Sequence, residues 1–173
     1  AYYDAASGVT VSLALGGQQD TVGAGLDRLI DVENLIGSRH DDVLIGNDGD
    51  NLLAGNGGDD TLTGGGGADT FKWMLGDTGI TTVTGFTPGL DSLDLSQLLT
   101  GEHGDSDSLD QYLTMAFGAD TTITVDSNSQ AIAGGTGQTI VLEGVNLLTH
   151  YSAADTASVI TSMLDDGSLK VDV

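Results

Sequence analysis

Oxygen-bearing side chains recur at every ninth position in one short stretch of the chain, at Asp42, Asn51, Asp60 and Asp69. Each of them follows a glycine-rich segment, so each side-chain oxygen lies beside a turn with many free backbone carbonyls. Carboxylate and carbonyl oxygens together are the ligands that Ca²⁺ prefers, and they are poor ligands for zinc or copper. The spacing therefore predicts a row of calcium sites in these turns.

Four nonapeptides without a gap, residues 37–72, carry these side chains at their sixth position. Glycine occupies the first position and an apolar residue occupies the eighth: Gly37, Gly46, Gly55 and Gly64, then Leu44, Leu53, Leu62 and Phe71. Leu35 extends the apolar series one step upstream, with Glu33 at the matching sixth position. The pattern predicts short strands with one inward side chain each, separated by tight turns. A flexible linker would not keep an apolar residue at every ninth position.

The repeats resemble the G-G-x-G-x-D-x-U-x nonapeptide of the RTX proteins, a parallel β-roll that binds Ca²⁺. The resemblance implies that two nonapeptides form one turn, so that repeats two apart stack on the same side. Asp42 would then share an ion with Asp60, and Asn51 would share one with Asp69. It also implies loop carbonyl ligands, from Ser38, His40, Gly55 and Gly57 for the first ion and from Asn47, Gly49, Gly64 and Gly66 for the second.

Two residues depart from the family pattern. His40 stands at a fourth position where glycine is usual, so we expect strain in the first loop. Asn51 stands at a sixth position where aspartate is usual, so the second site has one carboxylate fewer and is expected to be weaker.

The charge of the chain excludes several classes of function. The 173 residues include 26 acidic and 4 basic ones, for a formal net charge of −22. Such a charge excludes a nucleic-acid groove or an anionic membrane surface, and it opposes compaction unless cations neutralise it. The absence of cysteine excludes disulfides, a cysteine-ligated zinc site and a thiol nucleophile. No apolar run is long enough for a transmembrane helix, so no membrane insertion is expected.

Both flanks are predicted to cap the roll, because two turns of a stacked repeat need caps or further units. Asp155 is a candidate N-cap of the last helix, and Asp77 and Asp91 are further candidate metal ligands. We expect strands over 9–15, 81–86, 121–125 and 138–144, a strand or a frayed tail over 169–173, and helices over 109–117 and 155–164.

The predicted fold is mainly β. Its centre is a short calcium-binding parallel β-roll, a β-solenoid, over residues 37–75. Capping strands precede it over residues 1–36. A C-terminal α/β region with two short helices follows over residues 76–173, and it combines capping with a type I secretion signal.

The flanks also resemble known proteins. VENLIGS at 32–38 resembles the segment before the repeats of large bacterial RTX adhesins, and VITSMLDDGSLKVDV at 159–173 resembles the end of type I secretion target domains. The resemblance implies a module of a secreted, extracellular adhesin that acts in cell adhesion and biofilm formation. Its partners would be calcium ions and a type I exporter. We expect a monomer without enzymatic activity and without a nucleic-acid partner.

Two alternatives stay open. The chain could belong to a secreted protease or lipase with the same repeats, whose catalytic domain lies elsewhere. It could also be a ligand-binding or ice-binding solenoid segment, although the outward seventh and ninth positions of the repeats are irregular.

Overall fold

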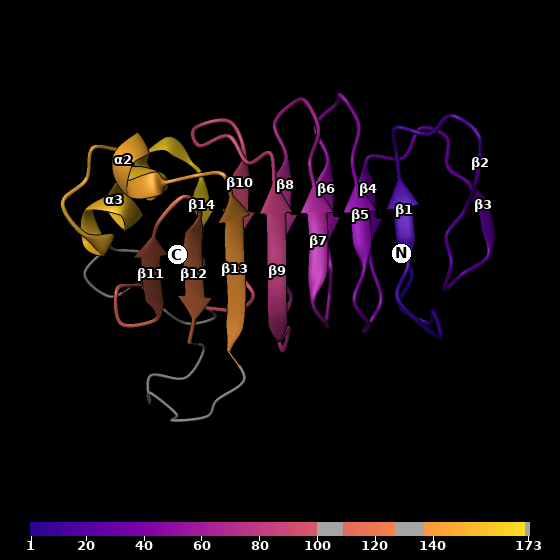
Figure 1. Cartoon of the computed structure of the whole chain (residues 1–173), viewed down its shortest axis with the longest axis horizontal. Helices are drawn as coiled ribbons and strands as arrows, with labels where there is room; N and C mark the ends of the chain where they lie inside the picture. Colours follow the sequence, from indigo (N-terminus) through magenta and orange to yellow (C-terminus); the bar gives the residue numbers. More distant parts are fainter. Residues whose placement is uncertain (100–108, 127–136, 172–173) are drawn as a thin grey trace.

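Short strands lie side by side along the long axis of the molecule in the computed structural model, which describes residues 1–99, 109–126 and 137–171 (Figure 1). One sheet has seven strands, in the order β1 (Thr10–Ser12), β5 (Val43–Ile45), β7 (Asp60–Thr63), β9 (Gly79–Thr84), β13 (Gln138–Glu143), β12 (Thr121–Val125) and β11 (Leu113–Phe117). The other has five, in the order β14 (Leu169–Lys170), β10 (Ser92–Asp94), β8 (Thr70–Lys72), β6 (Leu52–Ala54) and β4 (Asn34–Ile36). The predicted class, a mainly β chain with a parallel β-roll and few helices, is confirmed.

Successive nonapeptides alternate between the two sheets. β5 pairs in parallel with β7, with Val43 opposite Thr61, and β6 pairs in parallel with β8, with Leu52 opposite Thr70. The paired residues are 18 positions apart, which is two nonapeptides. Repeats two apart therefore stack on the same side, as predicted.

The eighth positions fill the space between the sheets. Leu44, Leu53, Leu62 and Phe71 are completely buried, and Leu35 is buried one step upstream. Their neighbours in the strands are more exposed, because successive side chains of a strand point to opposite faces. The buried residues beyond the repeats continue the same core: Val11, Val83 and Leu142 in the larger sheet, and Leu93 and Leu169 in the smaller one.

The parallel stacking continues beyond residue 75, where we expected the roll to end. Asp60 lies opposite Thr81, 21 residues later, and Thr70 lies opposite Ser92, 22 residues later. The regular offset is 18, so residues 76–84 and 86–94 are two further, degenerate nonapeptides, displaced by insertions at 73–75 and at Gly85. Gly79 occupies the fourth position of the first one and has a φ of 115°, close to the 113° of Gly58 in the repeat below it.

The C-terminal region extends the larger sheet. β13 pairs in parallel with β9, and β12 and β11 follow in antiparallel order. The predicted helix over 109–117 is wrong, because Leu113–Phe117 forms the strand β11. Leu113 and Met115 face inward there while Thr114 and Ala116 face solvent, the alternation of a half-buried strand.

Two helices lie at the C-terminal end of the roll (Figure 1). The predicted last helix is confirmed as α3 (Thr156–Asp166), where the Asp155 side chain accepts a hydrogen bond from the Ser158 N–H at 2.9 Å. The short α2 (Leu147–His150) was not predicted, since four residues carry no helical period. In the described ranges, no helix is long and apolar enough to cross a membrane.

The N-terminal edge of the larger sheet is closed by the chain itself. A small antiparallel ribbon of β2 (Gln18–Asp20) and β3 (Leu26–Arg28) lies beside it. The Gln19 side chain accepts from the Ser12 N–H and donates to the Ser12 carbonyl, both at 2.8 Å, and the Thr10 N–H donates to the Thr21 carbonyl. Three outward backbone groups of β1, the N–H groups of Thr10 and Ser12 and the Ser12 carbonyl, are thereby paired.

Candidate metal centres

The sixth-position side chains are buried, and those of Asp60 and Asp69 bond to the preceding turn of the roll. Asp60 Oδ1 accepts a hydrogen bond from the Asp42 N–H at 3.0 Å, and Asp69 Oδ1 accepts one from the Asn51 N–H at 2.9 Å. All four residues are at least 97% buried. The structure therefore brings together the two pairs that the sequence predicted, Asp42 with Asp60 and Asn51 with Asp69.

The fifth positions make the reciprocal bonds, which the sequence reasoning missed. Asp41 Oδ1 accepts from the Asp59 N–H at 2.8 Å, and Asp50 Oδ1 accepts from the Ala68 N–H at 2.7 Å. Fifth-position carboxylates thus bind the following turn, while sixth-position carboxylates bind the preceding one. The paired acids at 41–42 and 59–60 were the sequence signal for this arrangement.

The first-position glycines leave room for these carboxylates. A Cβ on Gly55 would lie 1.9 Å from Asp60 Oδ2, and one on Gly64 would lie 2.1 Å from Asp69 Oδ2. Neither glycine has a positive φ. Space beside the carboxylate, and not backbone conformation, therefore explains glycine at this position.

Two of the buried carboxylates keep an oxygen for a ligand. Asp60 Oδ2 and Asp69 Oδ2 accept no hydrogen bond from any residue that the structure describes. In contrast, both oxygens of Asp42 accept bonds, from the Val9 and Ser38 N–H groups at 2.7 and 2.5 Å. The open oxygens lie at the third and fourth repeats.

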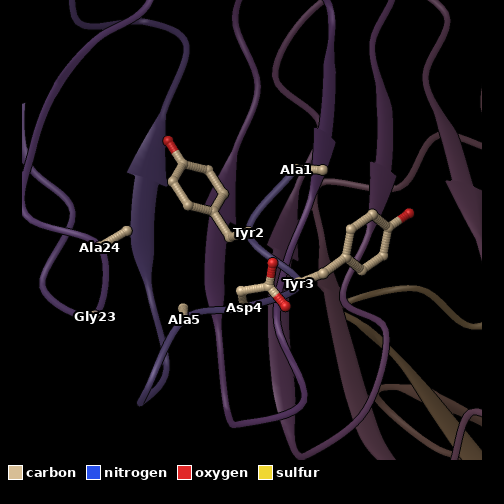
Figure 2. A pocket seen from close by; sticks show the side chains of 7 residues that line it. All are labelled: Ala1, Tyr2, Tyr3, Asp4, Ala5, Gly23 and Ala24. Atoms are coloured by element: carbon tan, nitrogen blue, oxygen red, sulfur yellow. The ribbon is translucent and has the colours of Figure 1, made fainter.

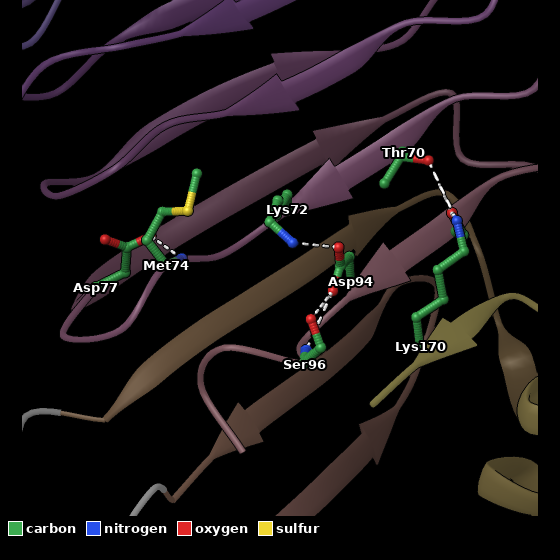
Figure 3. Close-up of polar contacts among 8 residues, drawn as sticks. Thr70, Lys72, Met74, Asp77, Asp94, Ser96 and Lys170 are labelled. Atoms are coloured by element: carbon green, nitrogen blue, oxygen red, sulfur yellow. Dashed lines mark hydrogen bonds and ion pairs between the residues drawn. The ribbon is translucent and has the colours of Figure 1, made fainter. Parts of the chain in front are cut away.

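Burial and mutual repulsion make the ionised form of these carboxylates unfavourable, so a nearby cation would stabilise them. Burial is the main cause that raises the pKa of Asp60 to about 7, and the charges of neighbouring carboxylates add to it: Asp42, Asp77 and Asp41. Burial and the charges of Asp91 and Asp50 also raise the pKa of Asp69. Among the residues described, the one ion pair of the chain is Lys72 with Asp94, on the outer face of the smaller sheet (Figure 3). Within the described ranges, no basic side chain therefore forms an ion pair with the stacked acids.

The predicted carbonyl ligands lie in the stacked loops. The Gly55 and Gly64 carbonyls face the preceding turn, 2.6 and 2.0 Å from where a Cβ on Gly37 or Gly46 would lie. The Ser38 carbonyl accepts from the Gly57 N–H at 3.3 Å, and the Asn47 carbonyl accepts from the Gly66 N–H at 2.9 Å. These bonds hold each predicted carbonyl-bearing loop against its partner two repeats away.

The strain expected at His40 is absent. His40 is not among the residues with positive φ, and neither is Gly49 at the same position of the next repeat. The left-handed fourth positions are Gly58 and Gly67, with φ of 113° and 85°. The fourth positions of the first two loops thus need no left-handed backbone, and a histidine fits there.

Asn51 leaves a polar atom without a partner. Its Oδ1 accepts from the Asn47 N–H at 2.7 Å. Its Nδ2 has no hydrogen bond and, unlike the open oxygens of Asp60 and Asp69, is fully shielded from solvent, which no other unpartnered side-chain nitrogen or oxygen in the described chain is. An aspartate would offer acceptors on both oxygens, as Asp42 does. The structure thus gives a physical reason to expect a weaker second site.

Of the two further candidates, Asp91 continues the sixth-position series. Its Oδ1 accepts from the Asp69 N–H at 2.9 Å and its Oδ2 from the Thr87 N–H at 2.8 Å. Asp77 lies at the second position of a degenerate repeat, and burial raises its pKa to about 6. Within the described residues, no three His, Cys, Asp or Glu side chains form a metal cluster, so a cation here needs the loop carbonyls as well.

A pocket of about 320 Å³ lies at the N-terminal end and is lined by the first five residues and by Gly23 and Ala24 (Figure 2). The Tyr2 hydroxyl donates to Asp27 at 3.2 Å, and burial, together with Asp27, raises the pKa of Tyr2 to about 12. Tyr2 therefore stays protonated near neutral pH and acts there as a hydrogen-bond donor.

Comparison with known proteins identifies the repeats. The RTX calcium-binding nonapeptide repeat family matches residues 36–71, in four copies. No curated protein matches the chain. Among solved structures, the chain is similar to the AlgE6R2 subunit of the Azotobacter vinelandii mannuronan C5-epimerase, with 23% identity and a TM-score of 0.33, over 75% of this chain and 92% of that one. Residues 36–71 are thus RTX repeats, and their ligand is Ca²⁺.

Proposed function

We propose that this chain is the calcium-dependent folding module and C-terminal secretion signal of a large extracellular RTX adhesin, exported by a type I system. The observation that carries the folding part is the stack of buried carboxylates, Asp42, Asp60 and Asp69, without a neutralising basic side chain among the described residues. Such a stack is costly in the folded state unless cations bind to it.

The stacking supports a proposal of three sites. The first lies between Asp42 and Asp60, with carbonyls of Ser38, His40, Gly55 and Gly57. The second lies between Asn51 and Asp69, with carbonyls of Asn47, Gly49, Gly64 and Gly66. The third lies between Asp69 and Asp91. Bound Ca²⁺ would compensate the negative charge of these side chains. All the proposed ligand atoms are oxygens, which Ca²⁺ prefers.

Calcium binding would then act as a switch between compartments. Extracellular calcium modules have Kd values of roughly 10⁻⁴–10⁻³ M, so the sites stay empty in a cytoplasm with little Ca²⁺ and fill outside. The free energy of binding becomes free energy of folding, since the sites exist only in the stacked roll. An unfolded, strongly negative chain is suited to passing through a narrow exporter.

The C-terminal residues would be recognised by the exporter first and would pack into the folded chain afterwards. Val159, Ile160 and Leu169 are buried in the folded chain, where Leu169 lies opposite Leu93 and extends the smaller sheet. If these residues form the recognised signal, the exporter reads them before Ca²⁺ folds the chain. The adhesin assignment rests on the resemblance of the flanks. A protease or lipase motif upstream in the open reading frame would instead favour the alternative, a secreted enzyme with the same repeats.

The folding part is tested by far-UV circular dichroism with chelator and with millimolar Ca²⁺. We expect a largely unfolded chain in chelator and a β-rich chain in Ca²⁺, with poor replacement by Mg²⁺, which demands rigid octahedral geometry. A chain that is fully folded in chelator would contradict this part of the proposal.

The signal part is tested by export through the cognate type I system. We expect Ile160→Asp to be retained in the cell and Thr161→Asp, which changes the exposed face of α3, to be exported. Asp60→Ala is the control for misfolding, because it damages the roll and leaves the signal intact, so it should still reach the medium. Normal export of Ile160→Asp would exclude this segment as the signal.

A further inference from the structure

The loop of the first degenerate repeat, residues 76–81, stacks on the loop of the third regular repeat. The Ile80 N–H donates to Asp59 Oδ1 at 2.8 Å, and the Gly58 N–H donates to the Thr78 carbonyl at 3.4 Å. A Cβ on Gly79 would lie 2.3 Å from the Gly58 carbonyl oxygen. The two loops are thus as close as those of two regular repeats.

The sixth position of this degenerate repeat is used for another purpose. It is Thr81, whose Oγ1 accepts hydrogen bonds from Trp73 Nε1 at 3.1 Å and from Gln138 Nε2 at 2.9 Å. This hydroxyl holds the roll to the C-terminal cap and provides no carboxylate. A regular site would therefore be missing its second acid here.

Asp77 supplies a carboxylate from the second position of the same loop. Its side chain is 8% exposed, and its Oδ2 accepts from the Met74 N–H at 2.7 Å (Figure 3). Its Oδ1 accepts no bond from any residue in the described ranges. Asp77 lines a polar cavity of about 440 Å³, together with Asn56, Gly57 and Gly58.

Asp60 is the sixth-position acid of the third repeat, on which this loop stacks, and its carboxylate interacts electrostatically with that of Asp77. It is 3% exposed, its Oδ1 is engaged by the Asp42 N–H, and its Oδ2 remains open. Arg39 also lines the cavity, but it forms no ion pair with Asp60 or Asp77, and both acids are within the described residues.

We propose that Asp60 and Asp77, with backbone carbonyls of residues 56–58, bind an additional Ca²⁺ between the third repeat and the degenerate repeat that follows the regular array. This inference rests on the calcium-dependent folding proposed above. Asp60 would then serve two ions, one shared with Asp42 and one with Asp77. The additional ion would fix the loop at 75–78, which also lines a second cavity together with Leu98, Val125 and Gln138 of the cap.

Calcium counting on the folded chain tests the site, with Asp77→Asn as the main variant. Asparagine retains an oxygen to accept from the Met74 N–H, so the loop keeps its hydrogen bond. We expect Asp77→Asn to bind one Ca²⁺ fewer than the wild type, Asp60→Asn two fewer, and Asp77→Glu the wild-type number. Asp4→Asn, which removes an exposed acid of the N-terminal segment, should change nothing.

Terbium luminescence gives a readout specific to this site. The chain has a single tryptophan, Trp73, which contacts Thr81 in the same loop, so Tb³⁺ bound beside Asp77 is sensitised by it. Tryptophan-sensitised emission should fall strongly in Asp77→Asn and should persist in Asp42→Asn. Should Asp77→Asn not reach the wild-type circular dichroism in Ca²⁺, recovery of folding and emission in Asp77→Glu would still support the site, and failure of both variants would overturn it.

Arg39→Gln separates the proposal from the alternative that Arg39 neutralises Asp77. With an ion at Asp77, removing the guanidinium should lower the Ca²⁺ midpoint and keep the ion count. With an arginine pair, Arg39→Gln should destabilise the fold and Asp77→Asn should lose no ion, which would overturn the proposal. A wild type that binds no Ca²⁺ at all would instead overturn the proposed function.

Discussion

Asp60 accepts a hydrogen bond from the backbone N–H of Asp42, a residue 18 positions earlier, at 3.0 Å. One carboxylate oxygen thus fixes the stacking of two turns, and the other remains for a cation. The Asp60 side chain therefore has a role in folding and a proposed role in ion binding. Replacing Asp60 with alanine would remove a proposed metal ligand and also the acceptor of the Asp42 N–H, so the loss of stability would combine both effects.

The first prediction concerns pH, through Asp60. Its pKa is raised from 3.8 to about 7 in the folded chain without metal, so folding favours its protonated form. Its contribution to stability is fully present below pH 3.8 and is lost as the pH rises through about 7. In chelator, we expect the β-rich signal in circular dichroism to increase as the pH falls from neutral toward 5.

Calcium reverses the direction of this pH dependence. The ion binds the deprotonated carboxylate, so protons compete with it and the Ca²⁺ midpoint should rise as the pH falls below about 7. Calcium titrations at several pH values measure this shift, with Asp60→Asn as the control in which much of it should vanish. A midpoint independent of pH would mean that Asp60 is not a ligand.

The second prediction concerns Asn51. Asn51→Asp replaces the buried, unpartnered Nδ2 with an acceptor and adds a negative charge at the second site. An unsatisfied buried polar group costs about 1–3 kcal/mol, so folding in saturating Ca²⁺ should become more favourable by an amount of that order. The Ca²⁺ midpoint should fall several-fold, and the chelated chain should become less stable because of the added charge.

Asn34→Asp, at an exposed position of β4, is the matched control for the change in charge. It should leave the Ca²⁺ midpoint nearly unchanged. A titration of Asn51→Asp that coincides with the wild type would show that Asn51 does not share an ion with Asp69.

The regular repeats could be predicted from the sequence because a period of nine fixes the strands, the inward residue and the stacking partner together. The degenerate repeats were missed since Thr81 and Phe86 replace the aspartate and glycine of the pattern. Their remaining signal was Gly79 and Gly89 at fourth positions, each followed four residues later by an apolar residue, Val83 and Leu93.

The strand β11 was predicted as a helix, and the apolar residues Leu109, Leu113 and Phe117 of the predicted segment recur at a spacing that also fits one face of a helix. Pairing with β12 decided the outcome, and such a long-range partner is not visible in a local pattern. The fifth-position carboxylates were missed for a similar reason, since their acceptor role depends on the adjacent turn.

The third prediction compares two glycines of one loop. A Cβ on Gly55 would lie 1.9 Å from Asp60 Oδ2, whereas one on Gly57 meets its nearest atom, the Arg39 Cα, at 4.0 Å. Neither position has a positive φ, so alanine is allowed by the backbone at both. Gly55→Ala should destabilise the calcium-bound chain by about 1–3 kcal/mol, and Gly57→Ala should be close to neutral.

Thermal unfolding in saturating Ca²⁺ measures the difference, and calcium counting shows whether Gly55→Ala also displaces the ion near Asp60. Equal melting temperatures for the two variants would mean that the first-position glycine is not there to make room for the carboxylate.

The fourth prediction concerns the N-terminal edge of the larger sheet. Gln19 is buried and pairs with both backbone groups of Ser12, as a neighbouring strand would. Gln19→Ala leaves the Ser12 N–H and carbonyl open on an edge strand, and such an edge can pair with another chain. We expect the wild type to sediment as a monomer in Ca²⁺, and Gln19→Ala to show dimers or larger species that grow with protein concentration. Gln18→Ala, at the exposed neighbouring position, is the control and should remain monomeric. The role of Gln19 as an edge cap would be refuted by a Gln19→Ala chain that stays folded and monomeric at every concentration tested.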